Sequence, residues 1–214
     1  MKTKNKALLL SLCAVLLVAA SVLGTMAYLT SQDAVTNTFS VGSVAITLDE
    51  LDVDNSTEGE NDRDKANSYT LLPGHQYTKD PIIHVASTSE DCYLFVIVKN
   101  EIAGIESDAT GDKTVAAQMT ETYGWNQVGT TANGNLYVYT GTDEGASAPL
   151  AVAANSNIPV FKTFKIDGDV NGTTLADYAN KTITVTAYAV QKDGFEDKAA
   201  SEIWTTAFND PALN

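Results

Sequence analysis

The chain has 214 residues, of which 27 are acidic and 13 are basic, so its formal net charge is −14 at pH 7. This length suits one domain with a substantial core, with or without a targeting segment. Such an acidic surface repels nucleic acids and anionic lipids, which excludes DNA and RNA as expected partners. Of the two cysteines, Cys13 lies in an apolar N-terminal run and Cys92 in a second apolar run. Once the first run is removed, neither a disulfide within the chain nor a cysteine-based zinc site can form, and we expect Cys92 to be a buried apolar residue.

The first 27 residues have the composition of an export signal. Three lysines among the first six residues supply a short basic start, and residues 7–27 are almost wholly apolar. Thr25 and Ala27 place small residues three before and one before a cut, as signal peptidase sites require. We therefore expect a signal peptide over residues 1–27, cleaved between Ala27 and Tyr28. The run of about 20 residues could also span a bilayer, so an uncleaved anchor is the alternative.

The residues behind the expected cut alternate like a β-strand. Phe39 and Val41 share one face, but the apolar residues at 44, 46 and 48 continue on the other parity. A one-residue slip reverses every side chain unless a bulge or bend absorbs it, and we place that bend at Gly42 and Ser43. Residues 49–65 carry eight acidic side chains and predict a solvated acidic loop.

The rest of the chain predicts a series of short strands. Apolar or alternating runs occur at residues 82–85, 92–98, 124–141, 158–166 and 181–190. The run 92–98 is apolar on both faces and predicts a central strand covered on both sides. Asn133-Gly134 predicts a tight hairpin turn with positive φ at both central residues.

Two further patterns indicate helices. Residues 114–122 predict a short helix, and apolar residues recur every three or four positions from Phe195 to Phe208, which predicts a helix packed on a sheet. The sum is a mainly β protein. We expect a jelly-roll or Ig-like β-sandwich with one or two short helices, forming a single secreted domain over residues 28–214 behind an N-terminal signal helix.

Few residues offer catalytic potential. His75 and His84 are the only histidines, and the sequence has no His-Glu-x-x-His, no Gly-x-Ser-x-Gly and no phosphate-binding loop. The two histidines flank a turn at Pro81 and could share a zinc ion, although separate polar histidines are the commoner arrangement. We therefore expect no enzyme and no cofactor.

Residues 167–178 come closest to a metal-binding loop. Acidic or amide side chains occupy positions 1, 3 and 5 of a calcium loop, and Gly172 occupies the sixth. Position 12 is Tyr178, where a calcium loop has a bidentate glutamate. Two interpretations remain, a plain connection between strands and a calcium site. The candidate calcium ligands are Asp167, Asp169, Asn171 and Asp177.

Three blocks of the sequence resemble the TasA/camelysin family of exported proteins of Gram-positive bacteria. The stretch TMAYLTSQDAVTNTFSVGSVAITLDE is similar to the family's leader and first strand. The stretches LLPGHQYTKDPIIHVASTSEDCYLFVIV and ITVTAYAVQKDGF look like later blocks of the same group, so the resemblance spans most of the chain. It implies removal of the leader by an endoplasmic-reticulum-type signal peptidase.

The same resemblance implies a structural role at the cell surface or in the biofilm matrix. Fibre-forming members assemble by donor-strand exchange, in which the N-terminal strand of one subunit completes a sheet of the next. Here that strand would carry Tyr28, Leu29, Val35, Phe39 and Val41. The implied partners are the signal peptidase, other copies of the chain, and matrix or cell-wall components. The alternatives are a monomeric secreted adhesion or binding module and a camelysin-like metallopeptidase, for which this sequence lacks His-Glu-x-x-His.

Overall fold

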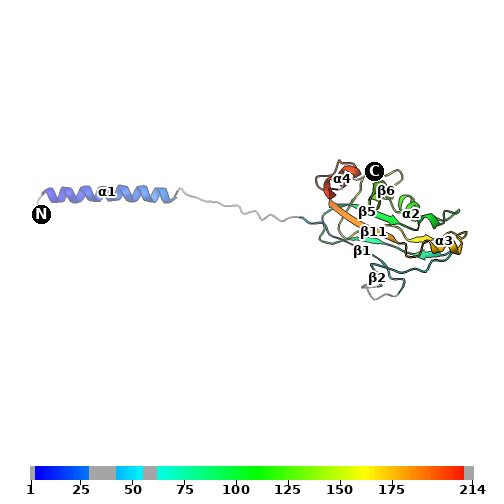
Figure 1. Cartoon of the computed structure of the whole chain (residues 1–214). Helices are drawn as coiled ribbons and strands as arrows, with labels where there is room; N and C mark the ends of the chain where they lie inside the picture. Colours follow the sequence, from blue (N-terminus) through cyan, green and yellow to red (C-terminus); the bar gives the residue numbers. More distant parts are fainter. Residues whose placement is uncertain (1–2, 29–41, 55–61, 210–214) are drawn as a thin grey trace. The chain divides into compact units, whose positions relative to one another are not determined.

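The chain divides into two compact units in the computed structural model, which describes residues 3–28, 42–54 and 62–209 (Figure 1). The first unit, Met1–Val41, contains helix α1 (Thr3–Tyr28), and the second, Gly42–Asn214, contains the described strands. Within the described residues, no helix combines the length and the hydropathy needed to cross a membrane.

The predicted N-terminal elements fall mostly outside the described residues. α1 runs through Ala27, and Tyr28 is its last residue, where the sequence places the first residue of the assembly strand. The other four residues of that strand lie outside the described part; they are Leu29, Val35, Phe39 and Val41. The signal peptide, its cleavage and the assembly strand therefore stay predictions.

The second unit is built around a five-stranded antiparallel sheet with β5 (Cys92–Asn100) at its centre. β11 (Ile183–Gln191) pairs with β5 along its whole length. On the other side, β5 pairs with β7 (Gly134–Tyr139) and with the short β8 (Ala151–Val152), and β6 (Trp125–Thr131) follows β7. Within residues 42–54 and 62–209, β11 is therefore the last strand on its side of the sheet.

Both faces of β5 are buried, which confirms the central strand predicted from its apolar run. Cys92, Leu94, Val96 and Val98 enter one core, whereas Tyr93, Phe95 and Ile97 enter a second core on the opposite face. The second core is closed by Ile203 and Trp204 of α4 (Ala200–Phe208). The predicted packing of the C-terminal helix on a sheet is confirmed, although the helix begins at Ala200 and not at Phe195.

A second antiparallel sheet covers the first core. Its strands, in spatial order, are β2 (Arg63–Asp64), β1 (Ile46–Leu51), β4 (Ile82–Val85) and β9 (Asn157–Pro159). A two-stranded sheet of β3 (Gln76–Thr78) and β10 (Thr163–Lys165) adds Phe164 to the same core. The remaining connections contain α2 (Val115–Glu121), α3 (Gly172–Ala176) and a 3₁₀ helix (Ala103–Ile105). The predicted mainly β fold with short helices is confirmed, and the jelly-roll or Ig-like connectivity stays a prediction.

The acidic segment 49–65 is not one solvated loop. Asp49 and Glu50 belong to β1, and Asp64 belongs to β2. Glu50 and Asp64 are only 5% and 1% exposed. Composition alone predicts a loop here, but Lys79 and Arg63 pair with Glu50 and Asp49 and hold these carboxylates in strands.

The hairpin between β6 and β7 differs by one residue from the turn predicted at Asn133-Gly134. Ala132 and Asn133 connect the strands, and Gly134 is already in β7, paired with Thr131. Gly134 has φ +135°, whereas Asn133 does not have a positive φ. A Cβ atom at position 134 would lie 2.5 Å from the carbonyl oxygen of Val98, so the glycine serves the close approach of β7 to β5.

The predicted strand at residues 158–166 is divided between two sheets. β9 ends at Pro159 and β10 begins at Thr163. Val160 and Phe161 lie between them and both are 0% exposed. Because β9 and β10 belong to different sheets, the chain crosses from one sheet to the other at these two buried residues.

We predict that Gly134→Ala lowers the free energy of unfolding by about 2–4 kcal/mol, because it combines an unfavourable φ with a backbone clash. Gly111→Ala is the matched control, since Gly111 also has a positive φ but has nothing within 4 Å of an added Cβ. It should be about 1–2 kcal/mol less stable than the wild type. Urea unfolding of both variants gives the comparison, and equal losses would contradict the close-approach explanation.

Candidate functional site

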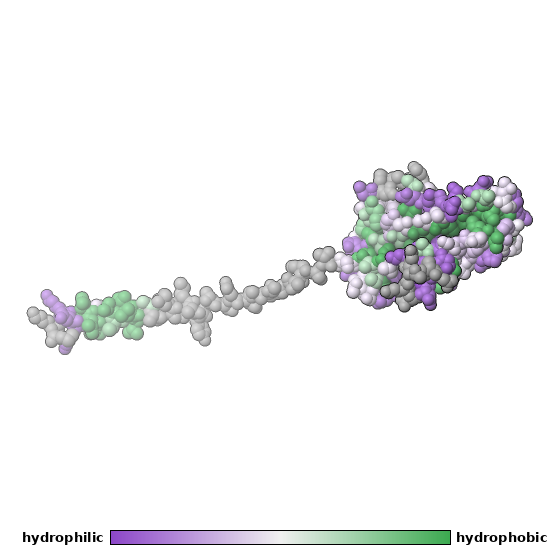
Figure 2. Space-filling view, turned by 60° about the horizontal axis from the view of Figure 1, so that its bottom comes forward, coloured by the Kyte–Doolittle hydropathy of each residue, from purple (hydrophilic) through white to green (hydrophobic). Residues whose placement is uncertain are grey.

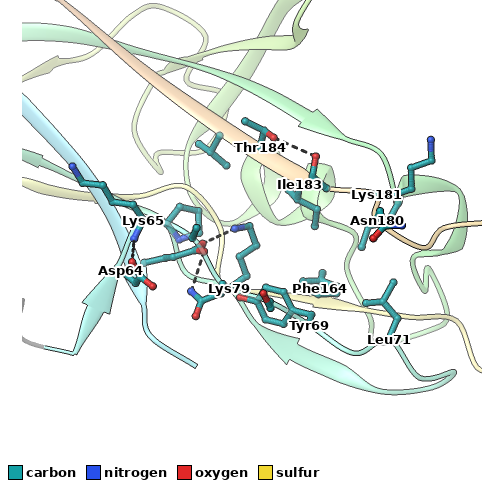
Figure 3. Close-up of a pocket in the computed structure, with 18 of the residues that line it drawn as sticks. Asp64, Lys65, Tyr69, Leu71, Lys79, Phe164, Asn180, Lys181, Ile183 and Thr184 are labelled. Atoms are coloured by element: carbon teal, nitrogen blue, oxygen red, sulfur yellow. Dashed lines mark hydrogen bonds and ion pairs between the residues drawn. The ribbon is translucent and has the colours of Figure 1, made fainter. Parts of the chain in front are cut away.

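A groove opens between β1 of one sheet and the start of β11 in the other (Figure 3). Its volume is about 1240 Å³, which exceeds the roughly 300–1,000 Å³ of pockets that hold small molecules. Residues 46–50 and 180–185 line its two sides, and residues 64–71 complete its wall. The size favours a polypeptide segment over a small molecule.

β11 has no strand partner on one of its edges among the described residues. On its paired edge, the N–H of Glu101 donates to the carbonyl of Thr182, and the N–H of Lys192 donates to the carbonyl of Asp91. Alternate residues of an antiparallel strand direct their main-chain groups to opposite edges. The groups that point to the open edge therefore belong to Ile183, Val185, Ala187 and Ala189.

β1 also has an open edge beside the groove. The N–H of Ala86 donates to the carbonyl of Ala45, so the odd residues of β1 face β4, and Ile46 and Leu48 direct their main-chain groups away from it. β2 pairs only with Glu50 and Leu51. Two rows of unpaired main-chain groups thus border one groove, which is the geometry that accepts an added strand.

The segment along the groove wall is held by side chains. The main chain of residues 66–71 makes no hydrogen bond to another main-chain group of the described chain. Asn67 Nδ2 donates to the carbonyl of Leu51, and the Tyr69 hydroxyl donates to the carbonyl of Thr78. The Tyr69 ring packs edge-on against Phe164 with 5.2 Å between centroids. Burial, and then the nearby negative charges of Glu50, Asp80 and Asp54, raise the pKa of the Tyr69 hydroxyl, so it remains a neutral donor.

Hydrophobic and polar groups meet in the groove. Tyr69, Leu71 and Phe164 lie on one side of the view in Figure 3, and Ile183 lies on the other. On the face of this unit seen in Figure 2, hydrophobic surface runs as a band between hydrophilic margins. A strand inserted here would find apolar contacts for one of its two faces.

A buried ion pair forms the polar part of the groove. Lys79 Nζ lies 2.5 Å from Glu50 Oε2, with side chains that are 11% and 6% exposed. Asn67 Nδ2 donates to the other carboxylate oxygen of Glu50 at 3.0 Å. The carboxylate of Glu50 is therefore satisfied by two donors, as a buried charge requires.

Separately from the Glu50–Lys79 pair, Arg63 links β2 to Asp49 and Asp80. Its Nε donates to Asp49 Oδ1, its Nη1 lies 3.4 Å from Asp80 Oδ2, and its Nη2 donates to the main-chain carbonyls of both acids. His84 Nε2 lies 3.0 Å from the same Asp49 oxygen. Burial acts to raise the pKa of Asp49, but the hydrogen bonds from Arg63 and His84 outweigh it and lower that pKa.

The histidines and Cys92 show no catalytic arrangement among the described residues. His84 contacts Asp49 and Asn157, whereas the His75 ring packs against Tyr77, so the two histidines have different partners. Cys92 is 0% exposed, as predicted. Burial, and then the charge of Asp91, raise the pKa of its thiol to about 11, which disfavours the thiolate form.

Side chains of the predicted calcium loop accept hydrogen bonds from main-chain N–H groups of the same loop. Asn171 caps α3, and its Oδ1 accepts from the N–H groups of Thr173 and Thr174. Asp167 Oδ1 accepts from the N–H of Asp169. The candidate ligand Asp177 is the C-cap residue of α3. A calcium site at Asp167, Asp169, Asn171 and Asp177 stays a prediction.

A different acidic group is brought together by the fold. Among the described histidine, cysteine, aspartate and glutamate side chains, Asp52, Asp54 and Asp64 place one ligand atom each within 4.8 Å of the others. Their carboxylates accept from the N–H groups of Asp54, Ser68 and Lys65 respectively. These bonds hold the three carboxylates near one another, and a cluster of acidic side chains does not by itself indicate a metal.

Sequence reasoning missed the polar groove residues Glu50, Lys79 and Asn67. One signal was present, because Glu50 has the same parity as Ile46 and Leu48 and therefore continues the inward row of that strand. Lys79 and Asn67 reach Glu50 only through the fold, and no local pattern connects them.

We predict that Arg63→Ala lowers the free energy of unfolding by about 1–2 kcal/mol at pH 7. The pKa of Asp49 is lower in the folded protein than in the unfolded chain, where it is about 3.9. Its interaction with Arg63 therefore stabilises the fold fully above that unfolded pKa, and the stabilisation is lost as the pH falls through the folded pKa. The loss should therefore shrink as the pH falls from 5 toward 2. Urea unfolding at several pH values, with Arg63→Lys as the charge-retaining control, measures it. A loss that is independent of pH would contradict the assigned role.

Within the described part of the chain, the groove has two open main-chain margins, a lining of mixed polar and apolar side chains and a buried ion pair, which together suit an extended polypeptide. Comparison with family models, with curated proteins and with solved structures found no match to this chain.

Proposed function

We propose that this chain is a secreted structural protein of the bacterial cell surface or biofilm matrix, and that its copies assemble into fibres by strand insertion. The observation that carries the proposal is the groove whose margins, β1 and β11, both have unpaired main-chain edges. Its occupant is the segment Tyr28–Val41 of a neighbouring copy. The protein acts through assembly and not through catalysis.

The path of the chain into β1 supports insertion into a neighbour. The carbonyls of Ser43 and Ala45 accept from the N–H groups of Glu90 and Ala86, so residues 43–45 continue alongside residues 86–90. They do not form the tight reversal that would return the chain to its own groove. The bend predicted at Gly42 and Ser43 stays a prediction, because the residues on its N-terminal side lie outside the described part of the chain. A return would have to take its turn from residues before Gly42, within the alternating segment itself.

The sequence of the segment suits the groove. Its odd positions include Leu29, Val35, Phe39 and Val41, which one face of an extended strand would turn toward the apolar wall. Each copy offers a strand at one place and a groove at another, so the contact is head-to-tail. Such contacts propagate without closing and give filaments.

Export supports the same role. The basic start, apolar run and small residues at 25 and 27 suit removal by a signal peptidase. Removal would free Tyr28 and the residues behind it for insertion. Matrix or cell-wall components are the further partners that a surface fibre would contact.

Assembly should depend on one face of the segment. Val35→Asp with Phe39→Asp should abolish fibres, because it would place two charges against the apolar wall. Thr36→Asp with Ser40→Asp adds the same charge on the other face and should leave fibres intact. Negative-stain microscopy and sedimentation of the exported protein provide the measurement, with deletion of residues 28–38 as the reference for complete loss. Undiminished fibres after that deletion would overturn the proposal, and monomers alone across a wide concentration range would favour a secreted binding module.

A further inference from the structure

Lys79 has hydrogen-bonding capacity that its described neighbours do not use. Its ammonium group has one described side-chain partner, Glu50, although its side chain is only 11% exposed. An ammonium group carries three N–H donors. In Figure 3 a dashed line joins the Lys79 side chain to a carboxylate oxygen among the groove residues. A nearly buried cation with unused donors is the part of the groove best suited to accept an acidic or carbonyl group from a ligand.

The segment that we place in the groove contains one acid. Asp33 is the only charged residue from Tyr28 to Val41. Counting by two from Val35, Phe39 and Val41 puts Asp33 on the same face as these apolar residues. A strand that turns its apolar face into the groove therefore turns Asp33 inward as well, where an unpaired carboxylate is strongly unfavourable.

We infer that Asp33 of one copy pairs with Lys79 of the next and thereby sets the register of the inserted strand. This inference rests on the proposed function. A slip of one residue would turn Asp33 out of the groove and every apolar side chain with it. A slip of two residues would keep the apolar face inward but would separate Asp33 from Lys79 and bring it against the apolar wall. Glu50, held by Asn67, keeps the ammonium group in place for both partners.

In the inferred pair, Lys79 both attracts the inserted strand and distinguishes one register of that strand from the others. A single buried polar group can specify register in an assembly whose apolar contacts would tolerate several alignments. The groove of this acidic protein would otherwise favour no particular alignment of a strand rich in threonine and serine. Among the lysines that line the groove, Lys79 is the nearly buried one, and its contact would distinguish position 33 from its neighbours.

Exchange of two adjacent residues tests the inference. Asp33→Ala combined with Ala34→Asp keeps the composition and the net charge but moves the acid to the opposite face. Both positions precede the compact unit that begins at Gly42, so the exchange leaves the groove intact. We expect the concentration for half-maximal fibre formation to rise about tenfold or more, as for the loss of one charge-assisted hydrogen bond.

A second background separates pairing with Lys79 from other effects. Lys79→Met with Glu50→Gln removes the ion pair without leaving either charge unpaired. In that background Asp33 would lie unpaired in the groove, so the exchange at 33 and 34 should no longer weaken assembly and should improve it, since coupled residues show non-additive effects. Thermal unfolding of each exported variant verifies that the domain is folded, and Lys79→Arg alone, which keeps the charge, should remain sensitive to the exchange.

The outcomes distinguish the two proposals. Unchanged assembly after the exchange, together with loss of fibres on deletion of residues 28–38, would overturn the role of Asp33 and leave the proposed function standing. An equal loss in both backgrounds would also overturn the pairing, because Asp33 would then act elsewhere. Fibres that survive the deletion would overturn both.

Discussion

β5 is apolar on both faces, and this constraint determines the layers of the domain. Its side chains alternate between two cores, so each face requires its own cover. The sheet containing β1 and β4 covers one face, and α4 covers the other. Because β7 and β8 occupy one edge of β5, β11 takes the other edge and becomes the last strand of the sheet. The open edge of β11, and with it the groove, follows from this arrangement.

The proposed role of the ion pair in the groove is selectivity more than stability. Removing two charges from water costs several kcal/mol for each ion, and replacing such pairs by apolar residues is often neutral or stabilising. Glu50 and Lys79 nevertheless lie beside apolar side chains such as Phe164. A groove built only to bury an apolar strand would not need them. The segment that we propose as the ligand would bring a polar group to this point.

Local patterns in the sequence predicted the elements that depend on local periodicity. β11 and α4 could be recognised because their side chains repeat with the period of a strand or a helix, and β5 because its run is apolar on both faces. Features set by distant partners could not. The turn before Gly134 is positioned by Val98 in another strand, and Glu50 is buried because Lys79 reaches it from 29 positions along the chain. The groove belongs to this second class, because alternation marks a strand but does not tell which of its edges remains unpaired.

Energetics indicate which contacts would control assembly. Ordering an extended segment costs about 1–2 kcal/mol per residue in backbone entropy, whereas each new main-chain hydrogen bond returns about 0.5–1.5 kcal/mol. Main-chain pairing along β1 and β11 therefore cannot drive insertion alone. Burial of an apolar side chain contributes about 1.5–3 kcal/mol. The few inward residues of the segment would therefore decide whether the free energy of insertion is favourable. Because the opposing free energies nearly cancel, such an assembly would be sensitive to a single inward side chain and would tolerate changes on the outer face. On the same balance, the proposed contact between Asp33 and Lys79 would select the register of a segment rich in threonine and serine.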